Sequence, residues 1–285
     1  MKKVLEYVKF FVCGIVFGTA NVIPGVSGGT MLVVFGVFDR LTEAISGIKK
    51  IFKNFAFLVT FALGAGAGIL LSAKVIGSMF ATYAIQTNMF FIGLILGGVP
   101  LILKLGTSEK KVKPLCIVPF LIAMAVVITL TVLEKQDIFT MTAENVTGFD
   151  LIVSLKMFVC AAIAAVTMII PGISGSFMMM LLGVYETIIG ALNEWNFYVI
   201  IPFALGAVVG IIFGAKLISV LIKKNKLMVY SAIMGMVIGS VYAILPDGFG
   251  FNLQSGYGFA FMLVGVLASV LIEKLNAASD VDSTQ

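Results

Sequence analysis

Residues 21–30 read Asn-Val-Ile-Pro-Gly-Val-Ser-Gly-Gly-Thr, and the pattern returns at residues 168–177 as Met-Ile-Ile-Pro-Gly-Ile-Ser-Gly-Ser-Phe. The same shift of 147 residues, which carries Pro24 onto Pro171, also places Asp39 on Glu186. Self-similarity over such a distance indicates an internal duplication. Because a Pro-Gly pair inside apolar sequence interrupts a helix, each copy predicts a broken helix.

The composition indicates a helical integral membrane protein. Hydrophobic residues make up 60% of the chain and charged residues only 12%, which a soluble domain of this size could not accommodate. The formal net charge of +5 comes from lysines in short connectors between apolar runs. That placement is typical of the positive-inside bias of membrane proteins, so we expect no nucleic-acid partner.

Missing residue types limit the chemistry of the chain. The sequence has no histidine and no Walker-type nucleotide loop, which excludes a Ser-His dyad, a Cys-His metal site and ATP hydrolysis by this chain. We therefore expect a transporter, not an enzyme, without cofactor or metal. A catalytic Ser-Lys dyad, with Lys74 or Lys216 as the base, is not excluded by the composition.

The apolar segments predict two repeats. Around each Pro-Gly pair the arms are about 13 and 10 residues long, too short to span a bilayer at about 1.5 Å per residue. The first repeat, residues 1–135, has a re-entrant hairpin at 9–38 and spans at 55–77, 88–104 and 114–133. An external connector covers 136–155, and the second repeat, 156–285, has a hairpin at 156–185 and spans at 197–222, 227–245 and 256–274.

The charges of the connectors predict the orientation of the repeats. Basic residues follow the first hairpin and fill 104–113, whereas 134–150 is acidic. Each hairpin then begins and ends on one side, with both termini cytoplasmic and the second half inverted. The sequence thus predicts an all-α membrane protein with an inverted repeat, each half a broken-helix hairpin plus three transmembrane helices. Inverted repeats with broken helices are typical of transporters.

The hairpin tips predict an anion site. Each second arm starts just after the motif, so unpaired N–H groups would point toward the membrane centre and attract an anion. Hydroxyls and glycines could complete one phosphate-sized cradle, and the alternative is that Ser27 and Ser174 only cap their helices. The candidate residues are Pro24, Gly25, Ser27, Gly28, Gly29, Thr30, Pro171, Gly172, Ser174, Gly175 and Ser176.

Four charged residues at matched positions are candidates for a pathway. Lys74 and Lys216 lie inside apolar spans, where a lysine either serves a pathway, pairs, or extends to the interface. Asp39 and Glu186 are expected at the C-terminal ends of the second arms, against the helix dipole, where they could pair with cations or carry protons. A coupling ion, either proton or sodium, and a homo-oligomeric state stay open.

The paired Ile-Pro-Gly-x-Ser-Gly motifs at Ile23–Gly28 and Ile170–Gly175, with the Gly-Val-Tyr-Glu run at Gly183–Glu186, resemble the PopT-type polyprenyl-phosphate transporters. The resemblance covers essentially the whole chain. It implies return of undecaprenyl phosphate from the outer to the inner leaflet of the bacterial cytoplasmic membrane for cell-envelope glycan synthesis. It also implies that the Pro, Gly and Ser residues of both motifs form the substrate site.

Two alternative functions stay open from the sequence. An ion-coupled transporter of a small soluble anion could use the same cradle. A membrane enzyme acting on lipid phosphates would release a product, which a carrier does not.

Overall fold

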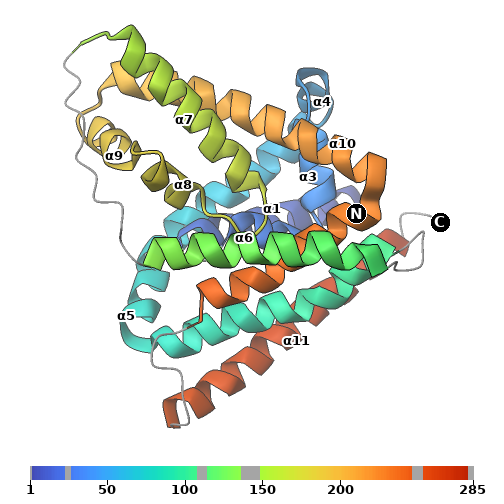
Figure 1. Cartoon of the computed structure of the whole chain (residues 1–285). Helices are drawn as coiled ribbons and strands as arrows, with labels where there is room; N and C mark the ends of the chain where they lie inside the picture. The colour runs from blue at the N-terminus through green and yellow to red at the C-terminus, as the bar shows by residue number, and fades with distance from the viewer. Residues whose placement is uncertain (1, 23–26, 108–113, 136–147, 246–252, 282–285) are drawn as a thin grey trace.

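The computed structural model describes residues 2–22, 27–107, 114–135, 148–245 and 253–281, and its regular elements there are all helices (Figure 1). The prediction of an all-helical fold is confirmed for these residues. The helices are α1 (Lys2–Val22), α2 (Gly28–Val34), α3 (Phe38–Ile45), α4 (Ile48–Lys53), α5 (Phe55–Thr107), α6 (Ile117–Lys135), α7 (Leu151–Ile169), α8 (Gly175–Leu181), α9 (Tyr185–Asn193), α10 (Phe197–Ala243) and α11 (Leu253–Val281).

Several helices are long and apolar enough to cross a membrane. Among the described residues these are Thr82–Thr107, Pro114–Leu133, Leu151–Ile169 and Phe197–Ala243. The pair α8 and α9 passes the same test only together and is bent by 108°, as in a broken span or a re-entrant loop. The chain is therefore a multi-pass membrane protein, whereas the inversion of its halves and their division at residue 135 remain predictions.

The spans predicted as separate segments follow one another almost without a loop. Two of them lie in α5 with a backbone break at Tyr83 (φ −134°, ψ 46°), and two lie in α10 with a break at Asn225 (φ −155°, ψ 79°). Tyr83 and Asn225 are 142 residues apart, which is the shift that aligns Phe61–Ala65 with Phe203–Ala207. Each long helix thus contains two successive helices joined at one residue.

Glycines mark the closest helix crossings in matched pairs. A Cβ added at Gly64 would overlap the Phe11 carbonyl oxygen of α1, and one at Gly206 would overlap the Phe158 carbonyl oxygen of α7. In the same way Gly93 of α5 approaches the backbone of α11, and Gly235 of α10 approaches the backbone of α6. Small residues permit such close backbone packing of membrane helices. The last helix of each predicted repeat therefore packs against the other repeat, α6 on α10 and α11 on α5.

Both second arms end earlier than expected. Helix α2 stops at Val34 and α8 at Leu181, because the chain turns at Gly36 and Gly183 with φ of 68° and 75°. Only glycine adopts this left-handed conformation without strain. New helices, α3 and α9, start directly after these turns.

Because α2 and α8 end early, two carboxylates lie in other helices than the sequence predicted. Asp39 and Glu186 lie in the first turns of α3 and α9, not at the C-terminal ends of the second arms. A carboxylate near a helix N-terminus is favoured by the helix dipole. The predicted conflict between these side chains and the dipole was therefore wrong.

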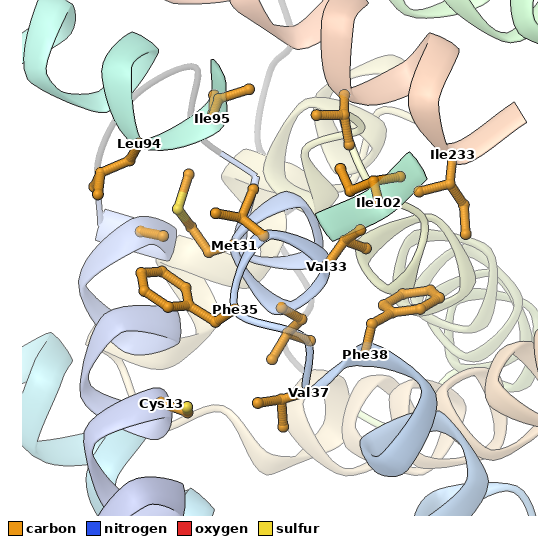
Figure 2. Packing of buried hydrophobic residues seen from close by; sticks show 14 of the residues in the cluster. Cys13, Met31, Val33, Phe35, Val37, Phe38, Leu94, Ile95, Ile102 and Ile233 are labelled. Atoms are coloured by element: carbon orange, nitrogen blue, oxygen red, sulfur yellow. The ribbon is translucent and has the colours of Figure 1, made fainter. Parts of the chain in front are cut away.

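The core is built around α2. All seven residues of this helix are buried, and Figure 2 shows Met31 and Val33 among Phe35, Phe38, Ile95 and side chains from α10. In α8, the matching helix of the second copy, Phe177 is the buried residue. The two copies of the motif therefore lie in different surroundings.

Candidate functional site: the contact between the two motif copies

The two copies of the motif contact each other directly. The Gly172 N–H donates to the Thr30 hydroxyl at 2.8 Å, and the Ser27 hydroxyl donates to the Ile173 carbonyl at 3.4 Å. Gly29 packs on the same loop, since a Cβ added there would lie 3.0 Å from the Ile169 carbonyl oxygen. The structure thus brings Ser27, Gly29 and Thr30 to the α7–α8 loop. Pro24 and Gly25 lie outside the described residues.

The loop between α7 and α8 requires glycine at position 172. Its φ is 81°, and a Cβ there would lie 2.8 Å from the Met236 carbonyl oxygen of α10. The preceding Pro171 is buried. The Pro-Gly pair therefore both ends α7 and lets the loop lie against α10 and the first motif copy.

The part of the first copy that follows the Pro-Gly pair, Ser27 to Thr30, is buried. Ser27 is 5% exposed and Thr30 is 0% exposed, and Gly28 and Gly29 are buried as well. The Ser27 side chain makes no capping hydrogen bond to its own helix. Its hydroxyl instead reaches the second copy, so the alternative that Ser27 only caps a helix does not hold. The first copy acts as a buried support for the α7–α8 loop.

The second copy is partly accessible at the start of α8. Ser176 is exposed, Ser174 and Gly175 are half-buried, and the hydroxyls of Ser174 and Ser176 are 2.7 Å apart. Ser174 also caps α8 by accepting a hydrogen bond from the Phe177 N–H at 3.4 Å. Two hydroxyls beside the first N–H groups of a helix can donate hydrogen bonds to an anionic oxygen.

Among the charged candidates whose side chains the structure describes, Asp39, Glu186 and Lys216 make no ion pair with one another. Lys216 lies on α10 with an exposed side chain. Lys74 lies in α5, and its side chain is outside the described part of the structure. Glu186 is exposed, whereas Asp39 is half-buried, and its Oδ1 atom is buried without a hydrogen-bond partner among the described residues. The described residues also include no cluster of acidic or cysteine side chains that could hold a metal ion.

The structure adds a charged cluster that the sequence analysis did not single out. Glu43 of α3 lies 2.5 Å from the Lys50 Nζ of α4 and 3.1 Å from the Lys223 Nζ of α10. The Ser219 hydroxyl also donates to Glu43. Lys50 first, then Ser219 and Lys223, lower the pKa of Glu43 to about 2. The only hint in the sequence was that Lys50 and Lys223 belong to connectors predicted on the same side.

Known proteins resemble this chain over most of its length. A family model described as undecaprenyl phosphate translocase-like matches residues 17–252. A protein of Staphylococcus aureus named polyprenyl-phosphate transporter is 28% identical over 276 residues, which is 94% of this chain and 96% of that protein. A Vibrio cholerae protein of the same name is 30% identical over 260 residues, 86% of this chain and 79% of that protein. No solved structure matches.

Proposed function

Because this chain belongs to the undecaprenyl phosphate translocase-like family, we propose that it carries polyprenyl phosphate across the bacterial cytoplasmic membrane. Two relatives that cover most of the chain carry the name polyprenyl-phosphate transporter, which supports this substrate. Such a lipid crosses slowly unaided because its charged head must leave water. The chain shelters the phosphate while the isoprenoid part stays in an apolar environment. The direction of net movement is from the outer to the inner leaflet.

The observation that carries this proposal is the contact between the two motif copies. Thr30 and Ser27 hold the α7–α8 loop by its backbone, and next to this loop the Ser174 and Ser176 hydroxyls lie 2.7 Å apart at the start of α8. The phosphate binds at these two hydroxyls and the neighbouring N–H groups. In this proposal the two motif copies contribute unequally to the predicted cradle, with the first copy supporting the loop and the second copy binding the phosphate.

The architecture supports alternating access of this site. The matched glycine contacts of α1 with α5 and of α7 with α10 are what two repeats of one fold would make. With the second repeat inverted and both termini cytoplasmic, rocking of the halves exposes the site to each leaflet in turn. Lys216, exposed on α10, lies on the route to the cytoplasmic side.

The test is transport by purified protein in liposomes with a labelled polyprenyl phosphate whose leaflet is read out. A variant with both Ser174→Ala and Ser176→Ala loses donors to a charged group, each worth roughly 1.5–3 kcal/mol. We therefore expect transport to fall at least about tenfold. The control is Thr60→Ala, whose exposed hydroxyl donates within its own helix to the Ala56 carbonyl. Its transport should match that of the unmodified chain.

The same assay decides between the remaining functions. Movement of inorganic phosphate without movement of the lipid would overturn the lipid substrate and favour a carrier of soluble anions. A dephosphorylated or otherwise altered lipid after incubation would favour an enzyme. Unchanged lipid transport in the double serine variant would remove the head-group site from the proposal while leaving the carrier function.

A further inference from the structure

A groove of about 650 Å³ lies between the end of α5, the start of α6 and the second part of α10. Figure 1 shows the second part of α10 between α6 and the second part of α5, and it packs against both helices. Each helix contributes apolar lining: Ile102 and Gly106 from α5, Ile117 and Phe120 from α6, and Leu227 and Met234 from α10. The groove is therefore built from parts of both predicted repeats.

Two hydroxyl groups in the wall are already paired within the protein. The Thr107 hydroxyl donates to the Leu103 carbonyl at 2.7 Å, and the Ser231 hydroxyl donates to the Cys116 carbonyl. These contacts leave an apolar surface facing the groove. A volume in this range is typical of sites for small molecules, so the groove is large enough for a segment of an apolar chain.

One edge of the groove, at Tyr230, is polar, because the Asp39 carboxylate of α3 interacts with the Tyr230 side chain. Tyr230 lines the groove, and the Lys226 Nζ lies 5.7 Å from the centroid of its ring. An apolar groove with a polar edge suits a molecule that has a long apolar chain and a polar head.

The groove belongs to the same helix pair that supports the motif contact. Gly172 packs against Met236 of α10 and Val127 of α6, where an added Cβ would lie 2.8 Å and 3.2 Å from their atoms. Met236 is two residues from the lining residue Met234. Val127 is seven residues from Phe120, or about 10 Å at the rise of a helix. One helix pair therefore connects the groove with the hairpin loop.

We propose that this groove binds a segment of the isoprenoid chain of polyprenyl phosphate, so that the protein recognises the chain as well as the head. This inference rests on the proposed function and extends it. The groove holds only part of the chain, and the remainder stays in the surrounding lipid. The Met234 end of the groove lies next to the α7–α8 loop, so a chain that leaves the groove there carries its phosphate toward Ser174 and Ser176.

The experiment compares two substrates with the same head, labelled undecaprenyl phosphate and geranyl phosphate, in liposomes carrying the full chain. Ile117→Trp fills the groove from an exposed position, since Ile117 is 59% exposed. The control is Ile122→Trp, because Ile122 is 60% exposed on the same helix and does not line the groove. We expect Ile117→Trp to reduce transport of the long lipid about tenfold while geranyl phosphate moves unchanged. Ile122→Trp should change neither rate.

Each other outcome overturns the inference in a distinguishable way. An equal loss for both lipids in Ile117→Trp would mean that the substitution disturbs the head-group site or the fold. No loss for either would mean that the chain does not use the groove. If the unmodified chain moves neither lipid, the proposed function itself fails.

A second measurement identifies the occupant of the groove. Undecaprenyl phosphate with a photoreactive group in its chain should label the α6 segment around Ile117, and labelling should survive a large excess of phosphatidylglycerol. Loss of labelling under that excess would make the groove a site for bulk phospholipid and would overturn the inference.

Discussion

The Gly172 N–H donates to the Thr30 hydroxyl at 2.8 Å, although the two residues are 142 positions apart. Each belongs to a different copy of the motif, and Thr30 has no exposed surface. This bond therefore fixes the loop that precedes the Ser174 and Ser176 hydroxyls.

Thr30→Val removes the acceptor and keeps the shape of the side chain, so the Gly172 N–H loses its partner. Side-chain hydrogen bonds in membrane proteins contribute roughly 0.6–1.7 kcal/mol, and we expect a loss of stability in that range. Thermal unfolding in detergent measures it. Thr30→Ser keeps the hydroxyl and should recover most of the loss. Equal stability of the Val variant and the unmodified chain would show that the bond contributes nothing.

Gly93→Ala tests the helix crossing between α5 and α11. The new methyl group would overlap the Met262 carbonyl oxygen, so the helices must separate. Overpacking of this kind costs about 1–3 kcal/mol. Gly66→Ala on the same helix is the matched control, because nothing lies within 4 Å of a Cβ added there. Unfolding in a denaturing detergent should show a loss for Gly93→Ala and no loss for Gly66→Ala; similar values for both would contradict the close packing.

Arg40 joins α3 to α1 and α5. Its Nη1 atom lies 2.9 Å from Glu6, and its guanidinium lies 4.2 Å from the centroid of the Phe10 ring and 5.1 Å from that of Phe57. The ion pair is half exposed and worth roughly 0.2–1 kcal/mol, whereas stacking on the rings adds about 0.5–1 kcal/mol.

Comparison of Arg40→Ala with Glu6→Gln separates these two contributions. We expect Arg40→Ala to lower the free energy of unfolding more than Glu6→Gln, because only the first substitution removes the ring contacts. Arg40→Lys should fall between them, since lysine keeps the charge but not the planar group. Equal losses for Arg40→Ala and Glu6→Gln would assign the whole effect to the ion pair.

The sequence predicted the features that depend on local residue type. Helix α1 ends at Val22 and α7 at Ile169, close to the positions expected from the two Pro-Gly pairs, and the spaced glycines mark the helix crossings. The early turns at Gly36 and Gly183 were missed. Glycine is frequent in membrane helices, so an isolated glycine does not reveal the positive φ that the surrounding structure imposes.

The unequal burial of the two motif copies could not be predicted from the sequence either. Thr30 and Phe177 occupy matched positions, yet one bonds to the other motif copy and the other packs into the core. The two ten-residue motif copies are similar in sequence, so their residues alone do not predict which copy the other helices will bury. The contact of Glu43 with Ser219 spans 176 positions, and it arises only when α3 packs against α10.

The Glu43 cluster has a predictable dependence on pH. Lys50, Ser219 and Lys223 lower the pKa of Glu43 from 4.5 to about 2 in the folded protein. A carboxylate whose pKa is lowered by folding stabilises the protein above its unfolded pKa, and this stabilisation is lost as the pH falls through the folded value. The cluster should therefore contribute fully above about pH 4.5 and vanish near pH 2.

Glu43→Gln should lower the unfolding temperature by a constant amount from pH 8 to about pH 5, and the difference should shrink below about pH 4.5. Because the Glu43 side chain is 40% exposed, 1 M salt should reduce the difference as well. Glu186→Gln, which removes an exposed carboxylate, gives the baseline for the loss of one charge. A difference that disappears between pH 8 and pH 6, or that grows as the pH falls, would contradict a carboxylate held in its charged form by two lysines.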